Sequence, residues 1–302
     1  MSILSGFRWF PQMRKSITKR QINTSGLVGE LFTPQGQGPF PAALCIGGSS
    51  GGVKTAAAPL LAEAGFVALS LGYFGAPGLL KEFAELPLEY FVQGVDWLLA
   101  QPMVRGRKVG VTGTSRGSEA ALQAATLTPH VGSVVAYVPS GIRWMGVAGR
   151  PSWTYNGKPL PYVQWPNDFD KGGAIAKVDR FKQILDNPAV WASAEIAIEK
   201  AACPLLLISG KNDQLWPSER MANLIMERLK KHSYPHHYEH IAYPNAGHRI
   251  KVPGLDPSSY EPVSEDTVTH EILSLGGTYE GNKLASEQSW NETVSFLRSA
   301  LG

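Results

Sequence analysis

Residues 109–121 read VGVTGTSRGSEAA, and they place Ser115 between two glycines at a point where the sequence pattern changes. The apolar run at 109–111 is typical of a buried strand, and the residues from 118 onward are typical of a helix. In a sharp strand-to-helix turn, side chains two residues before and after the serine would collide, which favours Gly113 and Gly117. The stretch therefore predicts that Ser115 presents its hydroxyl at a helix N-terminus, where free N–H groups favour negative charge.

The pattern G-x-S-x-G at 113–117 is typical of a serine nucleophile, and the strand before it and the helix after it make it more specific. A serine hydroxyl needs a base to remove its proton and an acid to orient that base. In chains with this turn, the acid and then the base follow on loops after later strands. Asp213 follows the apolar run LLLIS, and His248 follows a strand-like stretch and a turn. We therefore predict Ser115, Asp213 and His248 as catalytic residues.

Stabilising the oxyanion of an acyl-transfer intermediate takes two backbone N–H donors. One is expected from Arg116, directly after the nucleophile, and the other from the loop GGSSGG at 47–52. Ser49 and Ser50 are both candidates for the second donor, and the sequence does not choose between them. Gly48 in the same loop is predicted to contact the substrate. The loop matches neither of the common glycine-rich phosphate-binding patterns.

Short apolar runs alternate with amphipathic stretches from residue 40 onward. This alternation predicts an α/β fold with a mostly parallel central sheet and helices on both faces. Residues 1–40 predict an antiparallel hairpin at one edge, and we expect a single domain over residues 1–302. Strands are expected at 42–46, 66–71, 108–112, 133–138, 204–209 and 237–242, and helices at 55–64, 89–100, 118–126, 218–230 and 286–301.

Residues 141–200 interrupt this alternation and are rich in aromatic residues and turn formers. An insertion of this length in a compact domain is usually functional or peripheral. We interpret it as a partial cover over the carboxyl edge of the sheet, near the active site. Trp144 in this insertion and Trp216, just after Asp213, are predicted to bind substrate. A second loop-rich stretch is expected at 249–284.

Composition and charge exclude several classes of protein. The 302 residues include 28 basic and 25 acidic ones, and the net charge of +3 is not concentrated in any long run. Nucleic-acid-binding proteins usually cluster Lys and Arg, so no nucleic-acid partner is expected. No apolar window is long enough for a membrane span, and the N-terminus lacks the order of a secretory signal. Cys45 and Cys203 are predicted to be buried free thiols, which indicates a cytoplasmic protein.

We expect no metal and no other cofactor. The chain has no CxxC pair. His236, His237 and His240 cluster with Glu239, but on a strand positions 236 and 240 lie far apart. A surface edge is therefore favoured over a metal site.

Eight stretches resemble the catalytic domain shared by type-I acyl-CoA thioesterases and bile acid-CoA:amino acid N-acyltransferase, a branch of the α/β-hydrolases near dienelactone hydrolase. They occur in order over residues 40–300: PAALCIGGSSGG, LLAEAGFVALSLGYFG, LPLEYFVQGVDWLL, VGVTGTSRGSEAAL, YNGKPLPYV, PLLLISGKNDQLWPSE, YPNAGHRI and GGTYEGNKLASEQSW. The resemblance implies the α/β-hydrolase fold, with the nucleophile at Ser115, the acid at Asp213 and the base at His248. Eukaryotic members carry an N-terminal immunoglobulin-like domain, which we expect this chain to lack.

The resemblance implies a serine hydrolase that cleaves a thioester through an acyl-serine intermediate, with acyl-CoA among its expected small-molecule substrates. The acyltransferase branch uses a cysteine nucleophile, so the serine at 115 favours hydrolysis over amino-acid conjugation. The alternative enzyme is a carboxylesterase or dienelactone hydrolase-type hydrolase of small esters. A catalytically silent binding protein on the same scaffold is disfavoured by the intact set of three predicted catalytic residues. The sequence does not define the acyl chain, the leaving group or the oligomeric state.

Overall fold

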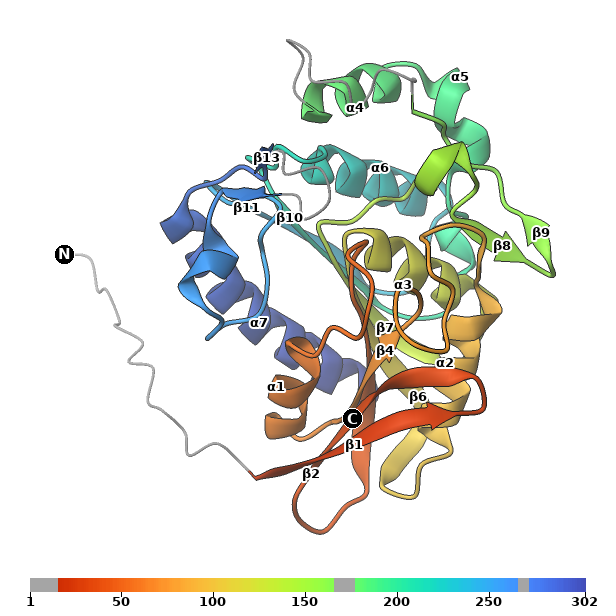
Figure 1. Cartoon of the computed structure of the whole chain (residues 1–302), viewed down its shortest axis with the longest axis vertical. Helices are drawn as coiled ribbons and strands as arrows, with labels where there is room; N and C mark the ends of the chain where they lie inside the picture. Colours follow the sequence, from red (N-terminus) through yellow and green to blue (C-terminus); the bar gives the residue numbers. More distant parts are fainter. Residues whose placement is uncertain (1–15, 166–176, 266–271) are drawn as a thin grey trace.

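The computed structural model of the chain describes residues 16–165, 177–265 and 272–302. Its centre is a sheet with the strand order β1-β2-β4-β3-β6-β7-β10-β11, covered by helices on both sides (Figure 1). The strands of this sheet are β1 (Ile17–Thr24), β2 (Leu27–Pro34), β3 (Phe40–Ile46), β4 (Val67–Gly72), β6 (Val104–Thr114), β7 (Val131–Tyr137), β10 (Leu205–Gly210) and β11 (Tyr238–Tyr243). Two smaller sheets contain β5 (Leu86–Pro87), β8 (Trp153–Tyr155) and β9 (Lys158–Pro159), and β12 (Val263–Glu265) and β13 (Ile272–Ser274).

The sheet is mostly parallel, with an antiparallel hairpin at one edge, as the sequence predicts. β1 and β2 pair antiparallel with each other, and β2 joins the sheet by pairing antiparallel with β4. The remaining neighbours, from β4 through β3, β6, β7 and β10 to β11, all pair in parallel. Since parallel strands end at the same edge, the loops after β3, β6, β7, β10 and β11 gather at one carboxyl edge.

Two layers of helices bury the faces of the sheet. α1 (Ala57–Glu63) and α7 (Tyr279–Leu301) pack on one face, and α2 (Glu89–Leu99), α3 (Arg116–Leu127) and α6 (Ser218–Lys231) pack on the other (Figure 1). Alternate strand residues supply the two cores: Leu44 belongs to the core under α2 and α3, while Ala43 and Cys45 belong to the core under α1 and α7. Cys45 and Cys203 are both buried and free, as predicted.

The chain between β7 and β10 contains helices that the sequence analysis did not predict. These are α4 (Lys177–Leu185), α5 (Pro188–Trp191) and the 3-10 turns Val147–Gly149, Ala192–Ala194 and Ile198–Lys200. α4 buries Val178, Phe181 and Leu185, which lie on one face of the helix. Phe181 and Leu185 belong to the same apolar cluster as Met221 of α6, so α4 is anchored on α6.

The last helix begins earlier than predicted, at Tyr279 rather than at residue 286. The Thr278 hydroxyl caps it by accepting a hydrogen bond of 2.9 Å from the Gly281 N–H. The glycines just before and inside its first turn suggested a loop, and the expected loop-rich stretch therefore ends at Thr278. That stretch also holds a 3-10 turn, Pro257–Tyr260, and the two strands of the smallest sheet.

Among the helices of the described ranges, none combines the length and the apolar character that crossing a bilayer requires.

We expect α7 to contribute strongly to stability, because its Leu297 is fully buried and packs directly over Gly110 of β6. Leu297→Ala should lower the free energy of unfolding by about 2–5 kcal/mol, the usual effect of emptying a buried leucine site. Leu284→Ala is the matched control, since Leu284 lies on the same helix and is 54% exposed. The control should change stability by less than about 0.5 kcal/mol in urea titrations. Equal effects of the two substitutions would contradict the packing of α7.

Candidate active site

The turn between β6 and α3 has a strained backbone at Ser115. Its φ of 56° and ψ of −122° lie outside the regions that residues with a side chain commonly occupy. The Ser115 N–H donates to the Tyr137 carbonyl of β7 at 3.0 Å. The Ser115 carbonyl accepts from the N–H of Ser118 at 2.9 Å and from its hydroxyl at 2.6 Å. These bonds fix the turn and present the Ser115 hydroxyl at the N-terminus of α3.

Two glycines make this turn sterically possible. A Cβ on Gly113 would lie 2.3 Å from the carbonyl oxygen of Gly117, and a Cβ on Gly117 would lie 2.2 Å from the carbonyl oxygen of Gly47. Both distances are far shorter than van der Waals contact, and the opposing atoms are backbone atoms that no side-chain rotation can move. The backbone of α3 therefore touches the end of β3, which brings the loop after β3 next to Ser115.

Three residues predicted as catalytic, Ser115, Asp213 and His248, form a continuous hydrogen-bonded chain. Nδ1 of His248 lies 2.9 Å from Oδ2 of Asp213, and Nε2 lies 3.0 Å from Oγ of Ser115. Oδ1 of Asp213 accepts from the backbone N–H groups of Leu215 and Trp216, at 3.0 and 3.2 Å. The Asp213 side chain is only 1% exposed. The carboxylate is thus fixed from both sides, and the imidazole bridges it to the serine hydroxyl.

Helix α7 fixes the loop that carries the imidazole. Asn282 of α7 is fully buried, and its Oδ1 accepts a hydrogen bond of 2.7 Å from the N–H of Gly247. Its Nδ2 donates to the carbonyls of Tyr260 and Gly276, at 2.8 and 3.3 Å. Asn282 could not be predicted from the sequence, because a polar residue within a helix gives no local indication of partners that are distant in the chain.

Tyr73, which follows β4, holds the loop after β3. Its hydroxyl lies 2.9 Å from the Gly47 carbonyl oxygen and 2.8 Å from the Gly48 carbonyl oxygen. In a trans peptide the N–H points away from the carbonyl, so the N–H groups of Gly48 and Ser49 are directed away from Tyr73. Gly48 itself packs on Ser115, since a Cβ there would lie 3.5 Å from the Ser115 Cβ. The sequence indicates this loop as a source of a backbone N–H donor, but it gives no indication that Tyr73 orients the loop.

The two predicted substrate-binding tryptophans have different surroundings. The ring of Trp216 lies against the His248 imidazole, with centroids 5.6 Å apart, and its Nε1 donates to the Val138 carbonyl. Trp144 is completely buried, and its ring packs edge-on against Phe181 at 4.8 Å. Trp216 therefore contacts the candidate site directly, whereas other side chains lie between Trp144 and the site. Contact with substrate stays a prediction for both tryptophans.

The Arg116 side chain turns into the protein interior, and the sequence analysis had considered only its backbone N–H. Its Nη1 lies 2.8 Å from Oε1 of Glu119, and both side chains are almost fully buried. Burial raises the pKa of Glu119 to about 7, and the positive charge of Arg116 opposes this shift. The other carboxylate oxygen accepts a hydrogen bond of 2.9 Å from Nε1 of Trp153. A buried ion pair thus lies in the first turn of α3, directly after Ser115.

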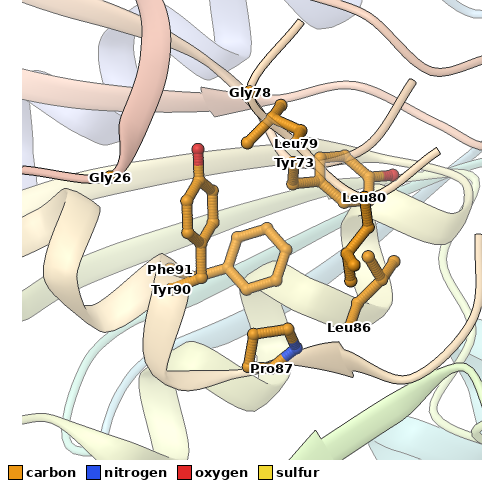
Figure 2. A pocket seen from close by; sticks show the side chains of 9 residues that line it. All are labelled: Gly26, Tyr73, Gly78, Leu79, Leu80, Leu86, Pro87, Tyr90 and Phe91. Atoms are coloured by element: carbon orange, nitrogen blue, oxygen red, sulfur yellow. The ribbon is translucent and has the colours of Figure 1, made fainter. Parts of the chain in front are cut away.

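A pocket of about 390 Å³ has the Tyr73 side chain in its wall (Figure 2). Its walls are mostly apolar and come from the hairpin turn, the chain after β4, and the start of α2. The lining residues are Gly26, Tyr73, Gly78, Leu79, Leu80, Leu86, Pro87, Tyr90 and Phe91. None of the three hydrogen-bonded residues lines it, so the pocket is separate from Ser115.

The histidine cluster near β11 has no ligand set for a metal. Nε2 of His240 lies 2.7 Å from the Ser209 hydroxyl, and Nδ1 lies 3.0 Å from Oδ1 of Asn223. In the part of the chain that the structure describes, no three His, Cys, Asp or Glu side chains are grouped closely enough to hold a metal ion.

Comparisons with known sequences identify relatives along most of the chain. Residues 86–302 match the family described as BAAT / Acyl-CoA thioester hydrolase C terminal. The chain is 31% identical over 307 residues to acyl-coenzyme A amino acid N-acyltransferase 1 of Mus musculus, covering 97% of this chain and 67% of the relative. It is 29% identical over 293 residues to acyl-coenzyme A thioesterase 1 of Homo sapiens, covering 95% of this chain and 66% of the relative. The chain thus spans about two thirds of the length of these relatives.

Solved structures share the fold at low sequence identity. A dienelactone hydrolase-like promiscuous phosphotriesterase from metagenomic libraries aligns with a TM-score of 0.58 at 17% identity, over 95% of this chain and 99% of the other. Dienelactone hydrolase from Anabaena variabilis aligns with a TM-score of 0.53 at 16% identity, over 96% of this chain and 100% of the other. The chain has the α/β-hydrolase fold, and it belongs to the BAAT / acyl-CoA thioester hydrolase C-terminal family.

Proposed function

We propose that the protein is a serine hydrolase that cleaves thioesters of the acyl-CoA type through an acyl-serine intermediate. The observation that carries this proposal is the hydrogen-bonded chain from Ser115 through His248 to Asp213 at the carboxyl edge of the sheet. Its order and geometry are those of a nucleophile, a base and an orienting acid. Family membership adds the substrate class, since relatives include acyl-coenzyme A thioesterases.

In the first step, Oγ of Ser115 attacks the thioester carbonyl carbon while Nε2 of His248 takes the hydroxyl proton. The Asp213 carboxylate holds the imidazole in the required orientation and stabilises its cationic form. The tetrahedral intermediate then collapses, the carbon–sulfur bond breaks, and His248 returns the proton to the leaving thiolate. The products of this step are the free thiol and the acyl-serine.

The oxyanion of the tetrahedral intermediate needs two donors close to Ser115. The N–H of Arg116 is one, because the first N–H groups of a helix have no intrahelical partner. For the second we favour Ser49 over Ser50, because the hydrogen bond from Tyr73 to the Gly48 carbonyl fixes the peptide that carries the Ser49 N–H. Both donors are preorganised, which is the main source of this kind of stabilisation.

In the second step, water attacks the acyl-serine while His248 removes its proton, and the carboxylic acid leaves as Ser115 is restored. An amine in place of water would give an amide, the reaction that the name N-acyltransferase denotes in the relatives. We favour water, because an acyl-serine is an oxygen ester and reacts less readily with amines than an acyl-cysteine would. Hydrolysis of oxygen esters is the competing function, and the dienelactone hydrolase among the structural neighbours motivates it.

Ser115→Ala should reduce kcat for a medium-chain acyl-CoA by about 10⁴-fold or more, because no other group forms the acyl intermediate. Asp213→Asn should reduce it by about 10³- to 10⁴-fold, since the amide favours the wrong imidazole tautomer. Release of free thiol measures the rate. Ser209→Ala is the control, because it breaks another Ser–His hydrogen bond, the one to His240, away from the turn at Ser115. Full activity in a folded Ser115→Ala protein would exclude the mechanism.

Tyr73→Phe should lower kcat by about tenfold with little change in KM, because the loop N–H groups would lose the bond that orients them. The ring and its packing against Phe83 and Phe91 are retained, so the fold should persist. Tyr90→Phe is a matched control, since the Tyr90 hydroxyl also donates to a backbone carbonyl, that of Gly72, but not to the loop after β3. Equal kcat values for wild type and Tyr73→Phe would show that the loop does not depend on Tyr73.

Substrate class is tested by comparing kcat/KM for acyl-CoA and for p-nitrophenyl esters with the same acyl chains. We expect a preference for the thioesters, and products identified by mass spectrometry should be carboxylic acids even when glycine is added. A preference for the oxygen esters would favour the competing function. Amide products would indicate acyl transfer.

A further inference from the structure

The ion pair between Arg116 and Glu119 is not used by the chemical steps above, yet it lies in the first turn after the nucleophile. Arg116 is 5% exposed, and Glu119 is completely buried. Taking two charges out of water is unfavourable, and buried ion pairs are often no more stabilising than apolar residues of similar size. Stability alone therefore gives a weak reason for such a pair at this position.

Apart from its ion pair with Glu119, the contacts of the Arg116 guanidinium lead to segments that lie outside α3. Its Nη2 donates to the carbonyl of Trp144 at 2.8 Å, to the carbonyl of Met145 at 3.3 Å and to the hydroxyl of Ser152. The guanidinium also lies over the ring of Phe83, 4.7 Å from its centroid. The planar guanidinium contacts all these partners from one fixed position, which a lysine or an apolar residue cannot do. The pair therefore attaches the chain around Trp144 and Ser152 to the nucleophile turn.

From Trp144 a row of aromatic rings leads back to the base. The Trp144 ring packs edge-on against Phe181 at 4.8 Å, and Phe181 packs against Trp216 at 6.2 Å. Trp216 in turn packs edge-on against the His248 imidazole at 5.6 Å. These contacts form a closed series, because His248 is hydrogen-bonded to Ser115, the residue before Arg116.

We propose that Arg116 and Glu119 are positioning residues: they clamp the 144–152 segment to α3 and, through Trp144, Phe181 and Trp216, hold the His248 imidazole in line with Ser115. Their effect is on the geometry of the nucleophile and base rather than on substrate affinity. A displacement of about 1 Å in a reacting group can lower a rate by about 100-fold, so a clamp of this kind has a measurable effect on turnover. The inference rests on the proposed function only in that Ser115 must be the nucleophile.

The decisive variant is the double substitution Arg116→Met and Glu119→Gln. It removes both charges together, and the glutamine keeps an acceptor for Nε1 of Trp153, so no buried charge is left unpaired. We expect a folded protein with a lower thermal midpoint, because the carbonyls of Trp144 and Met145 lose their donor. The rate of Ser115 labelling by a fluorophosphonate and kcat should both fall by about 10- to 100-fold. KM should change less than about threefold.

A matched control removes a different ion pair, one that joins α6 to the chain before β10. Arg228→Met with Glu199→Gln breaks the pair in which Nε of Arg228 lies 2.6 Å from Oε2 of Glu199, far along the chain from the nucleophile turn. This control should label at the wild-type rate. If both double variants lose labelling equally, or if neither does, Arg116 and Glu119 have no specific positioning role.

Phe181→Leu tests the aromatic row without altering either charged residue, and it decides the question if the charge-removing variant does not fold. We expect labelling to slow by about threefold or more while the far-ultraviolet circular dichroism is unchanged. Labelling at the wild-type rate in folded Phe181→Leu would show that the aromatic row does not position His248. A wild-type protein that does not label at Ser115 at all would instead refute the proposed function.

Discussion

The close approach of α3 to the end of β3 is the constraint on which the site depends. Gly117 lies so near the Gly47 carbonyl that any side chain would collide with backbone. This contact leaves Ser115 no room for an ordinary helical or extended conformation, and its φ of 56° follows. Strain of this kind persists only where the surroundings impose it, and the imposed geometry is what directs the hydroxyl toward the neighbouring loops.

The parallel sheet then determines which loops those are. Because β10 and β11 run parallel to β6 and β7, the turns that carry Asp213 and His248 end at the same edge as Ser115. Sheet topology brings these turns near one another, but further contacts are needed to place the side chains at hydrogen-bonding distance. Asn282 provides one such contact by joining the loop before His248 to α7. The Asp213 carboxylate is fixed by backbone N–H groups of its own turn. Remote, fully buried groups thus define the position of the two side chains.

The parts of the structure that the sequence predicts well are those with a local cause. Periodicity, turn residues or glycine spacing over a few positions predict the hairpin, the order of strands and helices, and the sharp turn at Ser115. Tyr73, Asn282 and the Arg116–Glu119 pair were missed, because their partners lie far away in the chain. The early start of α7 was missed for a different reason: Gly281 weakens the helical pattern, while the Thr278 cap and packing against the Asn245 loop outweigh it. Tertiary contacts decide these cases.

The Arg116–Glu119 pair lies at a position that the local sequence pattern identifies, but its partners are known only from the tertiary structure. A residue after the nucleophile contributes its N–H whatever its side chain, so the G-x-S-x-G pattern does not restrict the side chain at position 116. In this chain the position holds an arginine that donates to two carbonyls and a hydroxyl in the interior and lies beside the Glu119 carboxylate. An arginine buried there without these partners would be strongly destabilising, so the segment around Trp144 and Ser152 and the helix α3 must adopt one arrangement together. An insertion that lies outside the sheet is thereby bound to the same turn that the sheet constrains, and the position of the imidazole depends on both.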